Sequence, residues 1–209
     1  RVLETLGALR HTGNVTRVAR DGAGWITTLS DGSTLFSDAV VLAAGPQATP
    51  QIIADSPELT GEPGSAEGVW RERVLGVKLA PEFAVWRFWT DRPVNPDRPP
   101  FLGTAKFGPL DNVSVLEKFE LGAADWAAGS GGSVIELHAY AVPEGTDPDV
   151  LKAELRAELE RVYPETRGMR IVAEEYLIEQ DCALIGTGPW AERAGVTTPF
   201  EGLTLAGDW

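Results

Sequence analysis

The sequence predicts a mixed α/β fold, in which a mainly antiparallel sheet with helices is inserted into a part that holds a parallel sheet. Three observations predict it. Residues 39–44 are apolar on both faces, which is typical of a strand buried in a parallel sheet. Residues 73–142 are dominated by strand signals with turns between them, which favours antiparallel pairing. Residues 148–162 repeat leucine at the spacing of an amphipathic helix.

The first elements are expected to be a three-stranded meander over residues 14–37. Asp31-Gly32 marks its second hairpin turn, since Asp-Gly tolerates the positive φ that a tight turn requires. The buried strand 39–44 follows, and Gly45-Pro46 marks a sharp exit from the sheet.

A loop rich in glycine and proline, residues 55–68, is expected next and is a candidate domain boundary. Strands are then expected at residues 73–79, 83–90, 113–119, 133–142 and 170–179. One helix stands among them: Asp147 is its predicted N-cap, Pro148 occupies its first position, and Pro164 ends it.

The end of the chain returns to the first type of structure. Residues 186–202 form a predicted loop, and residues 203–206 a short apolar strand that leads into Gly207-Asp208. We therefore expect one domain to be interrupted by another. The expected divisions of the chain are residues 1–50, 51–183 and 184–209.

Composition narrows the class of protein. The chain has 209 residues, 18 Lys and Arg against 31 Asp and Glu, and a net charge of −13, which argues against binding to nucleic-acid phosphates or docking on anionic lipid by charge. Residues 1–50 carry four bases and four acids, whereas residues 51–183 carry thirteen bases and twenty-four acids. This asymmetry is a further indication of two structural contexts.

Cysteine and histidine content argue against a disulfide and against a metal site. Cys182 is the single cysteine, so a reducing, cytoplasmic compartment is expected. His11 and His138 stand far apart without neighbouring ligands at metal spacing. No apolar run approaches the roughly 18 residues of a transmembrane helix. We expect the chain to be an internal part of a longer protein, because it opens at Arg1 in a helix-like stretch and closes just after a Gly-Asp pair.

The Gly-Asp pair at residues 207–208 is the first candidate for chemistry. Glycine lets the backbone approach a ligand, and the aspartate accepts hydrogen bonds from ligand hydroxyls. Ligands of α/β sheets bind at the carboxyl ends of strands, which is where this pair stands. An ordinary strand followed by an Asp turn explains the same pattern, and the two interpretations stay open.

Trp86 and Phe88 share one face of the strand at residues 83–90 and are the second candidate. Their rings predict either a wall for an elongated apolar substrate or a core packed on the helix at residues 148–162. His138 is interpreted as a structural residue of its strand. No catalytic acid, base or nucleophile stands out.

The order of these motifs resembles the second half of flavin oxidoreductases of the amine-oxidase and phytoene-desaturase superfamily. The resemblance is carried by the meander with Asn14–Val18, by Ala39–Ala44 before Gly45-Pro46, and by the terminal Leu-Ala-Gly-Asp-Trp. Three further stretches look nearest to isorenieratene-synthase-like carotenoid enzymes. They are residues 101–119, 132–142 and 161–168.

The resemblance implies FAD as the cofactor and assigns residues to it. Val15 would meet the adenine through its backbone, Asp208 would hold a ribityl hydroxyl or lie near the pyrophosphate, and Trp209 would sit close to the flavin. The full implied set is Val15, Gly45, Pro46, Gly207, Asp208 and Trp209. Residues 51–183 would belong to the substrate domain.

The implied activity is removal of hydride equivalents from a hydrophobic, carotenoid- or isoprenoid-like substrate. The alternatives are a flavin amine oxidase and a catalytically silent binding or structural module. The family's N-terminal Gly-x-Gly-x-x-Gly unit and the helix after Gly-Asp are absent from this sequence, so we expect the 209 residues to need a missing N-terminal half as their partner for tight FAD binding. An isoprenoid substrate is compatible with peripheral membrane association of the whole protein.

Overall fold

The structure is a computed structural model that describes residues 5–207, and it divides into two compact units. Unit 1 comprises Arg1–Leu79 and Asp181–Trp209, and unit 2 comprises Ala80–Gln180. Unit 2 is therefore inserted between the two segments of unit 1. The chain passes from unit 1 to unit 2 after residue 79 and returns after residue 180. The sequence analysis placed these boundaries after residues 50 and 183.

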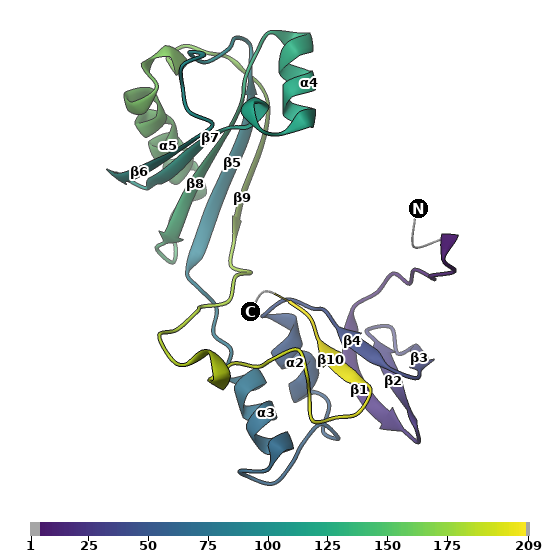
Figure 1. Ribbon diagram of the computed structural model, residues 1–209. Helices are drawn as coiled ribbons and strands as arrows, with labels where there is room; N and C mark the ends of the chain where they lie inside the picture. Colours follow the sequence, from purple (N-terminus) through teal and green to yellow (C-terminus); the bar gives the residue numbers. More distant parts are fainter. Residues whose placement is uncertain (1–4, 208–209) are drawn as a thin grey trace. The chain divides into compact units, whose positions relative to one another are not determined.

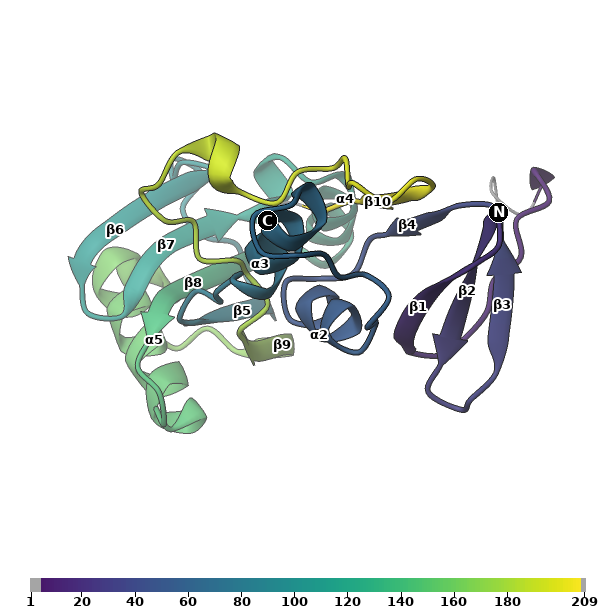
Figure 2. The ribbon, with the colours of Figure 1, turned by 90° about the horizontal axis from the view of Figure 1, so that it is seen from below.

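Unit 1 begins with the predicted meander. β1 (Val15–Asp21), β2 (Gly24–Leu29) and β3 (Thr34–Ser37) form an antiparallel sheet in that order, and the three strands run side by side in Figure 2. The second turn uses Asp31, whose carboxylate accepts hydrogen bonds from the backbone N and the hydroxyl of Ser33 at 2.9 and 2.6 Å. The meander prediction is confirmed.

The predicted parallel strand is also present. β4 (Val40–Leu42) pairs in parallel with β10 (Leu203–Leu205), so the two segments of unit 1 meet in one sheet. The prediction that both faces of this strand are buried is wrong at Val41, which is 66% exposed. In the part of the chain that the structure describes, β10 alone pairs with β4 and the core lies under one face only.

The loop predicted at residues 55–68 is present up to Ser65, whereas the strand predicted at residues 73–79 is wrong, because a helix runs through residues 66–75. Two helices lie between residues 48 and 79. They are α2 (Ala48–Ala54) and α3 (Ala66–Leu75), and Ser65 caps α3 by accepting a hydrogen bond from Gly68 N. The Arg71 guanidinium donates to four carbonyls, which ties α3 to the end of α2: those of Ile53, Ala54, Ser56 and Leu59.

These helices explain why the first boundary lies at residue 79. Their buried residues Ile53, Trp70 and Val74 join one hydrophobic cluster with Trp25 of the meander and Leu203 of β10. A cut at residue 50 would divide this cluster. A sequence rich in glycine and proline does not reveal this packing.

Unit 2 is an antiparallel five-stranded sheet in the order β6-β7-β8-β5-β9. Its strands are β5 (Glu82–Thr90), β6 (Phe101–Phe107), β7 (Leu110–Val115), β8 (Val134–Val142) and β9 (Ile171–Glu179). The first and last strands in chain order, β5 and β9, are neighbours, with Phe83 opposite Glu179.

Helix α5 (Pro148–Val162) covers one face of this sheet (Figure 1). Asp147 caps it as predicted by accepting hydrogen bonds from two backbone N–H groups, and Pro148 occupies its first turn. Its residues Leu151, Leu155 and Leu159 are buried against the sheet. The helix prediction is confirmed.

Two elements of unit 2 have no counterpart in the sequence predictions, namely β6 and α4 (Leu121–Ser130). The strand predicted at residues 113–119 ends at Val115 and continues as a 3-10 helix, Leu116–Lys118. None of the helices among residues 5–207 combines the length and apolar character that crossing a membrane requires.

Replacing Glu165 by glutamine is expected to destabilise unit 2 in a pH-dependent way. Arg98 donates two hydrogen bonds of 2.7 Å to this carboxylate, Asn95 N donates a third, and the Arg98 bonds hold the pKa of Glu165 at about 2, below the ordinary 4.5. A lowered pKa stabilises the fold above about pH 4.5, and this contribution is lost as the pH falls towards 2.

We therefore expect E165Q to lower the free energy of unfolding by about 1–2 kcal/mol at pH 7. This is the magnitude expected for the loss of a bidentate ion pair that solvent partly screens. Urea unfolding at a series of pH values measures the difference, which should close on acidification. E144Q, at an exposed glutamate, should show no such dependence. An equal loss in E165Q at pH 7 and pH 2.5 would contradict the assignment to the ion pair.

Candidate functional site

The carboxyl ends of the parallel strands β4 and β10 meet at one edge of unit 1. Pairing continues past β10, because Ala206 N donates a hydrogen bond of 3.0 Å to Leu42 O. Thr49 fixes the exit from β4 by donating its hydroxyl to Ala44 O and its N–H to Gly45 O, at 2.9 and 3.0 Å. This edge is where ligands of parallel sheets bind.

A pocket of about 270 Å³ opens at this edge. Leu205, Ala206 and Gly207 line it from the end of β10, and the segment 194–196 lines it from the preceding loop. The loop is held there by a hydrogen bond of 2.9 Å from Leu205 N to Val196 O. The pocket walls therefore combine the glycine and alanine residues of both segments with the apolar side chains of Trp190, Val196 and Leu205.

The predicted cofactor residues are distributed unevenly around this edge. Gly207 lines the pocket, Gly45 is exposed with open space where a Cβ would stand, and Pro46 is buried at the start of the turn into α2. Val15 is half-buried against the hydrophobic cluster that Ala44 also contacts, and it does not line the pocket. The predicted residues Asp208 and Trp209 lie outside the described residues.

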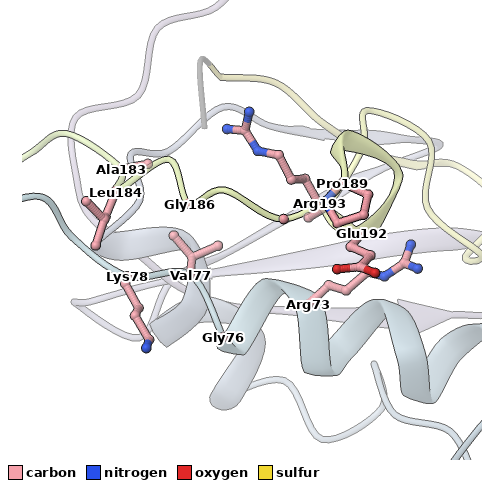
Figure 3. Close-up of a pocket in the computed structure, with 12 residues that line it drawn as sticks. Arg73, Gly76, Val77, Lys78, Ala183, Leu184, Gly186, Pro189, Glu192 and Arg193 are labelled. Atoms are coloured by element: carbon pink, nitrogen blue, oxygen red, sulfur yellow. The ribbon is translucent and has the colours of Figure 1, made fainter.

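A second pocket in unit 1, of about 370 Å³, was not predicted from the sequence. Figure 3 shows the side chains of Arg73 and Glu192 at one end and those of Lys78 and Leu184 at the other. Arg193 adds a third cationic side chain to the lining. Three cations against one carboxylate give this pocket a positive character that suits an anionic group.

Trp86 and Phe88, the candidates for a substrate wall, lie in the core of unit 2. They are 3% and 1% exposed, their rings lie 4.7 Å apart, and they belong to the cluster that contains Leu155. The Trp86 indole N–H donates to Glu174 at 2.9 Å, which satisfies its polar atom inside the fold. The structure thus agrees with the core interpretation and argues against a lining role.

Sequence reasoning missed a hydrogen-bonded group of side chains on unit 2. His138, interpreted as structural, contacts both Glu136 and Tyr140, at 2.9 and 3.0 Å. Hydrogen bonding, first from His138 and then from Arg87, lowers the pKa of Glu136 against the opposing effect of burial. The signal was present in the sequence: residues 136, 138 and 140 alternate along one strand, which places polar side chains on one face.

Comparison with known proteins yields close relatives in sequence. No family model matches the chain. It is 44% identical over 189 residues to a protein named carotenoid phi-ring synthase from Streptomyces griseus, covering 90% of this chain and 35% of that protein. A carotenoid phi-ring synthase from Chlorobaculum tepidum is 34% identical over 174 residues, covering 82% of this chain and 26% of that protein. The chain therefore spans between a quarter and about a third of the curated relatives it matches.

Solved structures share the fold at low sequence identity. A reduced UDP-galactopyranose mutase matches with a TM-score of 0.62 and 12% identity over 91% of this chain and 36% of that chain. A putative protoporphyrinogen oxidase from Exiguobacterium matches with 0.63 and 13%, covering 93% and 41%, and a putrescine oxidase with 0.59 and 12%, covering 98% and 44%. The mixed α/β fold class predicted from the sequence is confirmed.

Proposed function

We propose that the chain is part of an FAD-dependent oxidoreductase that removes hydride equivalents from a carotenoid. The observation that carries the proposal is the 44% identity, over 90% of the chain, to a protein named carotenoid phi-ring synthase. The fold shared with oxidases of known structure supports the redox class. The names of the sequence relatives favour a carotenoid substrate over an amine.

The edge at the ends of β4 and β10 fits one side of FAD. Open space at the Cβ position of Gly45 and the pocket beside Gly207 let a nucleotide lie against the main chain. We assign Gly45, Pro46 and Gly207 to this contact, and keep Val15, Asp208 and Trp209 as sequence-based proposals. FAD, when bound, supplies a two-electron acceptor for hydride.

The two units receive different roles in this proposal. Unit 1 contributes part of the cofactor domain, and its residues position FAD through backbone contacts. Unit 2 contributes the substrate domain, whose sheet offers a surface that excludes water from an apolar substrate. The rest of the cofactor domain, absent from these 209 residues, completes the site.

The proposed function is tested on the longer enzyme that carries this chain. We expect a yellow protein with flavin absorption bands, which converts the ring-bearing carotenoid β-carotene to a product with fewer hydrogens, measured by mass spectrometry. A colourless protein, or a flavoprotein that leaves the carotenoid unchanged and oxidises an amine, contradicts the proposal.

Gly45→Val is expected to weaken FAD binding to this enzyme by about tenfold or more, because an added side chain fills the space that the cofactor occupies in our proposal. Fluorescence titration of the deflavinated enzyme measures it. Gly103→Val is the matched control, since Gly103 lies in unit 2 and also has open space at its Cβ position. Equal FAD affinity in the two variants would remove Gly45 from the cofactor site.

A further inference from the structure

The sheet of unit 2 has a second face, opposite the one that packs on α5. Trp86 and Leu137 point into the core, so their strand neighbours Val85, Arg87 and His138 point the other way. Burial follows the same alternation along β5. The pairing of neighbouring strands therefore defines which residues lie on this open face.

A chain of hydrogen bonds crosses this open face. Arg87 donates to Glu136 at 2.8 Å, Glu136 contacts His138 Nε2 at 2.9 Å, and His138 Nδ1 contacts the Tyr140 hydroxyl at 3.0 Å. The Asn112 side-chain amide then donates to the same hydroxyl at 3.2 Å. Five side chains from three strands thus form one connected path.

The chemistry of the partners fixes the direction of these bonds. An ionised Glu136 only accepts, so His138 Nε2 carries the hydrogen, and in the neutral tautomer with Nε2–H the Nδ1 atom presents a lone pair. The Tyr140 hydroxyl therefore donates to Nδ1 and accepts from Asn112. This is the arrangement of a hydroxyl, a neutral imidazole and a carboxylate in series.

Further charged groups face the path. Glu175 of β9 stands opposite Arg87 in register, and the Asp111 carboxylate accepts a hydrogen bond of 2.7 Å from Tyr140 N. Arg87 is thus the cation of the path, and it pairs with Glu136 at 2.7 Å. The positive charge lies at one end, away from Tyr140.

The far end of the path is open to a ligand. Tyr140 is 53% exposed, whereas Asn112 is 5% exposed and its Oδ1 atom has no hydrogen-bond partner among the described residues. An unpaired buried acceptor is unfavourable by about 1–3 kcal/mol, which favours a ligand or water at this position. The exposed Tyr140 hydroxyl and the buried Asn112 amide therefore lie together at this end of the path.

Two apolar side chains lie on the same open face, beyond His138 along the row. In register, the row that contains Asn112 and His138 continues into Val85 of β5 and Leu177 of β9, and Leu177 is 43% exposed. A hydrocarbon can lie on these side chains while one of its C–H bonds faces the polar path. The combination suits a substrate that is apolar and loses a proton.

We propose that Tyr140 is a catalytic residue that accepts a proton from the substrate, with His138 and Glu136 as its positioning residues. This inference rests on the proposed function. A desaturation removes two hydrogens: one leaves as hydride with its electron pair to the flavin-class acceptor, and the other leaves as a proton. The second hydrogen is the one assigned to Tyr140.

The proton step balances within the path. The Tyr140 oxygen forms a new O–H bond with the departing proton while its original O–H bond breaks and His138 Nδ1 gains that proton. The electrons of the substrate C–H bond remain on carbon as the new π bond. The imidazolium that results is paired with the Glu136 carboxylate, so no isolated charge remains on this face.

The test uses the longer enzyme with FAD bound and β-carotene as the substrate. Y140F and H138Q are each expected to lower kcat by about 100-fold or more, with KM within about twofold, the size of effect of a lost general base. H138Q retains a hydrogen-bonding side chain but has no basic nitrogen, so a merely structural role predicts little loss. The double variant should lose no more than either single one, because the two groups act in series.

Y176F is the matched control. The Tyr176 hydroxyl donates to Pro148 O at 3.1 Å on the α5 side of the same sheet, so Y176F loses one hydrogen bond of unit 2 without touching the path. Its kcat should stay within about threefold of the wild type. FAD content, read from the flavin absorption, should be equal in all variants.

A second readout is independent of turnover. Nitrogen-15 NMR should show His138 with a protonated Nε2 and an unprotonated Nδ1, and the Nδ1 signal should shift in Y140F but not in Y176F. The signals that disappear in H138Q identify His138 among the histidines of the longer enzyme. A reversed tautomer would overturn the assignment.

The outcomes separate this inference from the function on which it rests. A wild type that binds no FAD or leaves β-carotene unchanged overturns both. An active wild type with Y140F and H138Q within threefold of it overturns the role of Tyr140 alone. Loss in Y140F together with full activity in H138Q also overturns it, because the path would then not carry the proton.

Discussion

Replacing Leu155 by alanine is expected to lower the free energy of unfolding of unit 2 by about 3–4 kcal/mol. Leu155 is fully buried in the cluster between α5 and the sheet, so alanine would leave a cavity there. Urea unfolding measures the loss, and hydrogen exchange followed by mass spectrometry locates it.

A change on the same helix provides the control. Val150 is 54% exposed, and V150A should change the free energy of unfolding by no more than about 0.5 kcal/mol. Because the cluster of unit 2 shares no member with that of unit 1, the exchange rates of the amides around Trp25 should stay unchanged in L155A. A loss below 1 kcal/mol would mean that α5 does not pack as described.

Replacing Gly132 by alanine is expected to destabilise unit 2 by about 3 kcal/mol. An added Cβ would stand 1.9 Å from Thr90 O, a backbone atom. The backbone there cannot move freely, because Thr90 N donates to Ser133 O at 2.9 Å and Ser133 N donates to the Thr90 hydroxyl at 3.0 Å. The added methyl must break one of these bonds or displace the strand.

Replacing Gly129 by alanine, three residues earlier, is expected to change the stability of unit 2 in the opposite direction. It lies in α4, and its Cβ position meets nothing within 4 Å. G129A should stabilise the helix by about 0.5 kcal/mol, because alanine loses less backbone entropy than glycine. Thermal unfolding of the two variants tests the pair, and similar effects in both would refute the steric argument.

Elements governed by local signals were predictable from the sequence. Alternating polar and apolar residues and the Asp31-Gly32 turn predict the meander. The N-cap and the leucine spacing predict α5. The helices α2 and α3 were missed, because Gly68 was assigned to the loop predicted at residues 55–68 and no element was predicted at residues 48–54. Pro50 stands in the first turn of its helix, where proline is tolerated. Gly68 is required there, because its Cβ would lie 2.3 Å from Glu62 O.

The candidate sites divide in the same way. The edge formed by β4 and β10 followed from two apolar strands ending in glycine, a signal within each strand. The path through His138 depends on which residues of β5 and β7 stand opposite β8. No local sequence pattern predicts the register of strands that are up to about 50 residues apart in the chain. Trp86 and Phe88 looked alike under both interpretations, since an aromatic strand face suits a pocket and a core equally.

The adjacency of β5 and β9 has a consequence for how such proteins diverge. The chain leaves unit 1 after Leu79 and comes back by Ala183, and these two residues form a β-bridge with each other. A genetic exchange with crossovers at the two sides of this bridge would replace the whole of unit 2 and leave the elements of unit 1 intact. Unit 2 could then be exchanged by recombination in one event, without a change in the length of either connection.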